Sequence, residues 1–125
     1  MDLPPDLESA IDSKVLDDFR GSGDGAEAFL TMLIEQYLAE AALRMAEVKD
    51  AVDRRDAAAL RLAAHSLKGN SGTVGAKKLA SVCGELETLA RDTALDGTPA
   101  LLIKLEEEFT RVRGALEREQ RHPRL

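Results

Sequence analysis

Aromatic residues and cysteines are scarce in this sequence. Its 125 residues include no tryptophan, one tyrosine and three phenylalanines. Leucine, alanine and valine must therefore supply the core, which suits a helical bundle. The single cysteine, Cys83, cannot form an internal disulfide, so we expect the protein in the reducing cytoplasm. Cys83 shares a helix face with Leu79, Val82 and Leu86, which predicts a buried, inert thiol.

The marks of several functional classes are also missing. Two histidines and one cysteine show no metal-ligand spacing, and the glycine-rich stretch 21–25 lacks the residues that complete a phosphate-binding loop. A net charge of −6 without a basic stripe argues against nucleic acid as a partner. No apolar run reaches the length of a membrane span, and there is no signal-peptide pattern. We expect no metal, nucleotide, nucleic-acid or membrane site on this chain.

Apolar residues recur at three- and four-residue steps through most of the chain, and no stretch alternates with the period of a β-strand. The pattern predicts an all-α protein, an antiparallel four-helix bundle with a short accessory N-terminal helix. One domain would span residues 11–119, between an extended lead at 1–10 and a C-terminal tail at 120–125 that includes His122. The expected helices run from Asp12 to Arg20, from a cap at Asp24 to Arg54, from a cap at Asp56 to the turn at 72–75, from Ala76 to Leu95, and from Thr98 to Glu119.

The inward side of the longest helix is predicted from seven apolar residues, with Leu30, Ile34 and Leu38 widening the stripe near its start. Met32 is expected to fill a gap in the core rather than to form a binding surface. The seven residues of the stripe are Phe29, Leu33, Tyr37, Ala41, Met45, Val48 and Val52.

The segment 63–75 holds His65, the only histidine outside the tail. If this segment is helical, His65 lies about 140° from the centre of an apolar stripe and faces solvent. Other histidines of this kind usually have no role, so its surroundings decide the interpretation. The stripe consists of Leu60, Ala63, Ala64, Leu67 and Ser71.

The neighbours of this imidazole are unusual for an exposed helix face. Lys68 lies one turn on, Arg61 one turn back, and Gly69 and Gly72 line the same face. A glycine inside a helix costs about 1 kcal/mol relative to alanine, which points to another reason for its presence, such as the close approach of a second molecule. The alternative is that the glycines fray and end the helix. We favour that alternative for Gly75, at the turn, and not for Gly69.

A histidine side chain can act as a nucleophile without a separate base. Its reference pKa of about 6.5 leaves the ring largely neutral at cytosolic pH, with a lone pair for a phosphoryl group. Lys68 and Arg61 would offset the charge of the product. In an antiparallel hairpin, Glu87 and Arg91 lie near the level of His65. Either one could hold the unreactive ring nitrogen or assist the phosphate, or both are ordinary solvated charges.

The motif His65-x-x-Lys68-Gly69, followed by Ser71 and Gly75, resembles the signature of histidine-containing phosphotransfer (HPt) domains. The resemblance extends along most of the chain, through Phe29-Leu30…Leu33-Ile34 before the site and Leu79-Ala80…Cys83…Leu86-Glu87 after it. Gly72 and Thr73 depart from the pattern, because many members carry alanine and another residue there.

The resemblance implies a four-helix bundle that acts as a phosphocarrier and not as an enzyme. His65 would be the phospho-acceptor, Lys68 its cationic neighbour and Gly69 the residue that leaves room. The partners would be response-regulator receiver domains or a hybrid histidine kinase, with one aspartyl phosphate as donor and another aspartate as acceptor. Magnesium would be held by the receiver, so no cofactor is expected on this chain. We expect a monomer.

Leu62 is an apolar residue on a face that solvent alone would make polar. It lies about 60° around the helix from the histidine, on the side away from the two cations. With Ala58 and Gly69 it would form an apolar patch that a receiver buries, and Arg61 and Gly72 would also face the partner. The alternative is that Leu62 packs against a neighbouring helix.

Two other functions compete with phosphotransfer. One is a helical adaptor whose histidine is never phosphorylated. The other is a histidine-based hydrolase, which would need an orienting acid, a second nucleophile or a pocket, and the sequence shows none of these. We rank phosphotransfer first, the adaptor second and the hydrolase last.

Overall fold

The computed structural model describes residues 10–20 and 25–121, and within these ranges it contains helices and no strand. No helix among these residues is both long and apolar enough to cross a membrane. The elements are α2 (Ser13–Arg20), α3 (Ala26–Arg54), α4 (Ala57–Thr73), α5 (Lys77–Arg91), the short 3₁₀ helix η1 (Leu95–Gly97) and α6 (Thr98–Arg121).

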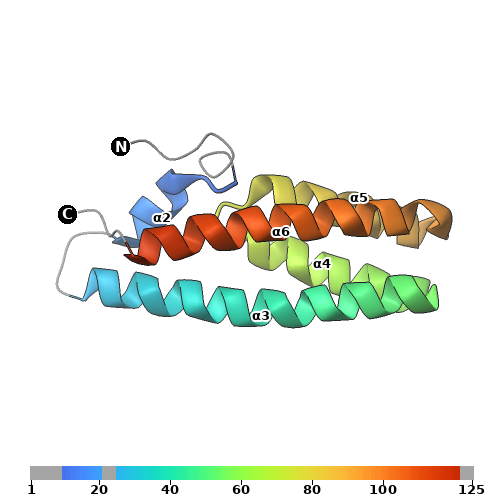
Figure 1. Ribbon diagram of the computed structural model, residues 1–125, viewed down its shortest axis with the longest axis horizontal. Helices are drawn as coiled ribbons and strands as arrows, with labels where there is room; N and C mark the ends of the chain where they lie inside the picture. Colours follow the sequence, from blue (N-terminus) through green and yellow to red (C-terminus); the bar gives the residue numbers. More distant parts are fainter. Residues whose placement is uncertain (1–9, 21–24, 122–125) are drawn as a thin grey trace.

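The four long helices form an antiparallel bundle (Figure 1). Each packs against the next in chain order, and α6 closes the ring against α3. The fully buried large side chains are leucine, valine and isoleucine, with Cys83 buried among them, as the scarcity of aromatic residues predicts. The predicted fold class, a four-helix bundle with a short accessory helix, is confirmed.

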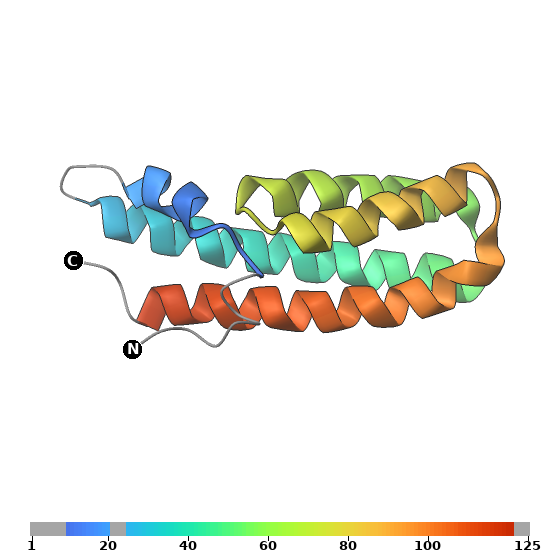
Figure 2. The ribbon, with the colours of Figure 1, turned by 90° about the horizontal axis from the view of Figure 1, so that it is seen from above.

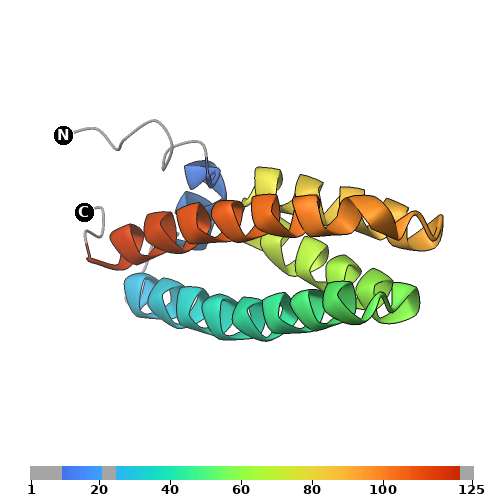
Figure 3. The same cartoon turned by 45° about the vertical axis from the view of Figure 1, so that its right-hand side comes forward.

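Helix α2 occupies space that the α4–α5 hairpin leaves open. Helices α4 and α5 have 17 and 15 residues, against 29 in α3 and 24 in α6, so the hairpin ends partway along its neighbours. Figures 2 and 3 show α2 beyond the hairpin turn, at the end of the bundle where α3 begins. The Asp12 N–H donates to the Gly75 carbonyl at 2.9 Å, and Lys77 Nζ lies 3.1 Å from the Asp12 carboxylate. These contacts join α2 to the turn that follows α4.

The start of α3 buries only part of its expected stripe, with Leu30 and Ile34 inward as predicted. Phe29 and Met32 are exposed, so the predictions that Phe29 faces the core and that Met32 fills a gap in it were wrong. Helix α2 packs on α3, and the large apolar residues buried near the start of α3 are Leu30 and Ile34, one residue around from Phe29. The buried residues of α3 are Leu30, Ile34, Tyr37, Ala41, Val48, Ala51 and Val52.

Two predicted helix caps are present. The Asp56 carboxylate accepts the Ala59 N–H at 3.0 Å at the start of α4, and the Asp12 carboxylate accepts the Lys14 N–H at 3.0 Å at the start of α2. Asp24 lies outside the described residues, and the N-cap of α3 is Gly25 without a side-chain cap. Side-chain oxygens thus satisfy free N–H groups at the first turns of α2 and α4.

Two other boundaries differ from expectation. Helix α5 ends at Arg91 and not at Leu95, because Thr93 takes a left-handed φ of 53°. Helix α6 begins at Thr98 as predicted, where the Thr98 hydroxyl donates to the Leu95 carbonyl at 2.7 Å. Helix α6 continues to Arg121, past the predicted boundary at residue 119, while His122 lies outside the described residues.

Candidate functional site

Helix α4 has one fully packed face and one open face. All five residues of the predicted inward stripe are buried, including Ser71. His65 lies on the opposite face with 66% of its side chain exposed, as predicted. Packing of the stripe thus directs the histidine outward.

A buried hydrogen bond holds α4 against α3. The Tyr37 hydroxyl and Ser71 Oγ lie 2.8 Å apart, both inside the core. Burial raises the pKa of Tyr37 to about 12, so its hydroxyl stays protonated. Because a buried hydroxyl without a partner is costly, this pair favours the one rotation of α4 that brings the two groups together.

Glu87 of α5 contacts two residues of the predicted site at once. Its Oε2 lies 2.9 Å from His65 Nδ1, and its Oε1 accepts a hydrogen bond from Lys68 Nζ at 2.5 Å. The Glu87 side chain is only 17% exposed. The Lys68 hydrogen bond, with a smaller contribution from His65, holds the pKa of Glu87 below its ordinary value of 4.5. Glu87 is therefore a carboxylate at neutral pH.

The charge of Glu87 decides which ring nitrogen of His65 is reactive. A carboxylate can only accept hydrogen bonds, so Nδ1 must carry the proton of their contact. In the neutral ring, Nε2 then keeps its lone pair, and it makes no hydrogen bond with any residue that the structure describes. In this neutral form, the contact with Glu87 orients the ring so that the lone pair of Nε2 is not the one engaged.

A hollow of about 430 Å³ surrounds the exposed ring, lined by Ala58, Arg61, Leu62, His65 and Glu87. Leu62 is 71% exposed, so the alternative in which it packs against a neighbouring helix was wrong. The exposed ring therefore shares its hollow with the cationic Arg61 and the apolar Leu62.

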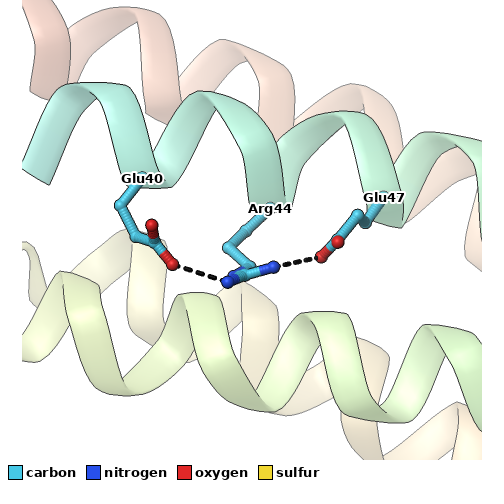
Figure 4. A network of polar contacts seen from close by, with 3 residues as sticks. All are labelled: Glu40, Arg44 and Glu47. Carbon is cyan, nitrogen blue, oxygen red and sulfur yellow. Dashed lines mark hydrogen bonds and ion pairs between the residues drawn. The ribbon is translucent and has the colours of Figure 1, made fainter.

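A second hollow, of about 440 Å³, lies on the other side of Leu62, between α3 and α4. Arg44 of α3 lines it and is held between Glu40 at 2.6 Å and Glu47 at 2.7 Å. Figure 4 shows these three side chains pointing from α3 toward α4. Leu62 stands between this charged groove and the hollow around the histidine.

The glycines of α4 fall into two kinds. Gly69 and Gly72 lie inside the helix, and a Cβ added to either would meet no atom within 4 Å. Gly75 has a φ of 78°, and a Cβ there would lie 2.9 Å from the Asp12 carbonyl oxygen. The turn thus requires Gly75, as predicted, while no contact within the described residues requires Gly69 or Gly72.

The hairpin register brings Glu87 to His65 but not Arg91. Arg91 Nε lies 3.8 Å from Asp92, and no contact joins it to the histidine. A residue that the sequence did not single out is Gly84, where an added Cβ would lie 3.8 Å from Lys68 Cδ. The same register would have found it, since the pair 68 and 84 has the same midpoint in the sequence, residue 76, as the pair 65 and 87. The Lys68 stem therefore passes close to Gly84 of α5.

Residues 32–115 match the family model of the Hpt domain. The chain belongs to this family. A crystal structure of histidine-containing phosphotransfer protein B (HptB) from Pseudomonas aeruginosa PAO1 is similar to 92% of this chain and 97% of that one, with 34% identity and a TM-score of 0.83. No curated protein sequence matches the chain. The function of the chain is histidine phosphotransfer in a phosphorelay, and Hpt domains are phosphocarriers that act with receiver domains and histidine kinases.

Proposed function

We propose that His65 is the phospho-acceptor of this Hpt domain. It receives a phosphoryl group from the aspartyl phosphate of one receiver domain and passes it to the aspartate of another. The observation that carries the proposal is the contact of Nδ1 with ionised Glu87, which leaves an exposed Nε2 lone pair.

The transfer is a displacement at phosphorus. The Nε2 lone pair forms the N–P bond while the P–O bond to the receiver aspartate breaks, and that aspartate leaves as a carboxylate. Nδ1 keeps its proton throughout, so the phosphorylated ring is cationic and Glu87 stabilises it from 2.9 Å. The reverse displacement delivers the group to the next receiver.

The receiver domain supplies the metal ion for the transfer. Magnesium, held by the receiver's acidic residues, stabilises the charge on the transferring group, so no nucleotide, metal or cofactor site on this chain takes part. The chain works as a monomer in the cytoplasm, where the single buried thiol of Cys83 needs no oxidising partner. Its partners are receiver domains, alone or within a hybrid histidine kinase.

Docking uses the open face of α4. Leu62 and Ala58 offer apolar surface beside the ring, and Gly69 and Gly72 let the receiver backbone approach closely, because no side chain projects there. Arg61 lies at the same hollow and faces the phosphoryl group that the receiver brings. Burial of Leu62 at such an interface contributes about 1.5–3 kcal/mol to binding.

Replacement of His65 by Gln tests the assignment. With a phosphorylated receiver as donor, the wild-type chain should take up acid-labile, base-stable label and His65→Gln should take up none. Stability should change by no more than about 0.5 kcal/mol, as for other exposed residues. Label on a folded His65→Gln, for example on His122, would move the site elsewhere. An unlabelled wild-type chain that binds receivers would support a helical adaptor instead.

A further inference from the structure

Two cations flank His65 on α4, and their surroundings differ. Lys68 Nζ is bound to Glu87 at 2.5 Å, and the Lys68 stem passes Gly84 of α5. Arg61 is exposed and makes no ion pair with any residue that the structure describes. One cation is already engaged before a phosphoryl group arrives, and the other is not.

The two cations also line different hollows. Arg61 lines the hollow that contains the His65 ring. Lys68 lines a separate one on the α5–α6 side, with Gly84 and Leu101 among its other residues. Since Nδ1 of the ring faces Glu87, Nε2 is on the far side of the ring from the carboxylate that Lys68 holds.

We propose that Arg61 is the residue of this chain that contacts the phosphoryl group on His65, and that Lys68 is a positioning residue that acts through Glu87. This division of roles rests on the proposed function of His65. It differs from the expectation that Lys68 is the cation that shields the phosphate.

The cost of reaching the phosphate favours Arg61. Lys68 Nζ is held at Glu87, on the Nδ1 side of the ring, so approaching a phosphoryl group on Nε2 would draw it away from a carboxylate that is 17% exposed and has Lys68 as its strongest hydrogen-bond donor. Arg61 needs only a change of rotamer from solvent, and its planar guanidinium can donate two parallel hydrogen bonds to phosphate oxygens. Lys68 in turn keeps Glu87 ionised and in place against Nδ1.

The pKa of the phosphoryl group on the histidine depends on which cation lies near it. Phosphohistidine can be prepared with phosphoramidate, a small donor that needs no docking surface, and its phosphorus resonance can be followed against pH. A nearby cation lowers the pKa of the phosphoryl group, because it favours the dianion. We expect Arg61→Ala to raise this pKa by about 0.5 unit, the size of an exposed charge contact. Arg61→Lys should restore most of the shift.

Lys68→Ala should leave the phosphoryl pKa unchanged but slow phosphorylation by phosphoramidate by about fivefold or less. Glu87→Gln should slow it as well, and the double variant should be no slower than the slower single variant, because both changes act on the same contact. Lys49→Ala, an exposed cation on α3, is the control and should change neither quantity.

A shift of the phosphoryl pKa in Lys68→Ala that equals or exceeds the shift in Arg61→Ala would overturn the division of roles. So would additive slowing in the Lys68 and Glu87 double variant. Neither result would affect the assignment of His65, which fails only if the wild-type chain takes up no phosphoryl group on that residue.

Discussion

The two faces of α4 are built under different constraints. On the inward face every position of the stripe is buried and the one polar residue, Ser71, is paired with Tyr37. On the outward face Leu62 is 71% exposed, and a Cβ added to Gly69 or Gly72 would meet no atom within 4 Å. Folding alone would favour polar residues or alanine at these three outward positions. The inward face therefore serves the fold, and the outward face suits the contact with a receiver that we propose.

Leu67→Ala on the inward face should cause the largest loss of stability. It tests whether the inward face can be damaged without an effect on the chemistry of the outward face. Leu67 is completely buried, so its truncation should lower the free energy of unfolding by about 2–5 kcal/mol, as measured by urea denaturation. Phosphorylation of His65 by phosphoramidate, measured where the variant is still folded, should stay near the wild-type rate. A folded Leu67→Ala that has lost phosphorylation would show that the two faces are not independent.

Leu62→Glu is the matching change on the outward face. Because a receiver would bury Leu62, transfer from a phosphorylated receiver should slow by about tenfold to a hundredfold. Phosphorylation by phosphoramidate and the melting temperature should not change. Ile103→Glu on α6, at a residue that is 59% exposed, is the matched control and should leave receiver transfer intact. Equal loss with both donors, or equal loss in the control, would remove Leu62 from the docking surface.

Gly75→Ala tests the end of α4, where the fold and not the partner requires a glycine. A left-handed φ costs an alanine about 1–2 kcal/mol, and the Cβ would also press on the Asp12 backbone, so α2 must shift. The control is Gly25→Ala, where φ is 87° but nothing lies within 4 Å of the added Cβ. Thermal unfolding should show a larger loss for Gly75→Ala. Equal losses would mean that the contact between α2 and the turn adds no stability.

Most of α4 could be predicted from the sequence, but the start of α3 could not. In α4 most of the large apolar residues fall in one stripe, with Leu62 as the exception, so the helical period indicates the buried side. Residues 28–34 of α3 are apolar almost all the way round, and the period cannot choose between Phe29 and Leu30. The choice depends on α2 packing against α3, a contact between segments that no local pattern encodes. The end of α5 is similar, because threonine rarely adopts the left-handed φ that Thr93 has.

The candidate site could also be predicted only in part from the sequence. The hairpin register places both Glu87 and Arg91 near the level of His65, but only the structure shows that Glu87 bridges His65 and Lys68. That bridge depends on three side-chain rotamers and on the partial burial of the carboxylate, which sequence spacing does not determine. Likewise, the sequence shows where the glycines are but not what a side chain in their place would touch.

Gly69→Ala makes the smallest change and tests the contrast between the two faces most sharply. An added methyl group meets nothing within 4 Å, and alanine favours the helix by about 1 kcal/mol, so the variant should melt at a higher temperature than wild type. Transfer from a receiver should nevertheless slow, because the methyl group projects where the partner approaches, while phosphoramidate should react normally. Gly84→Ala on α5 should gain similar stability without slower transfer, since its Cβ would make only an ordinary contact with Lys68. A more stable Gly69→Ala with unchanged receiver transfer would mean that the glycine leaves no needed room for a partner, and its presence inside α4 would have no functional reason.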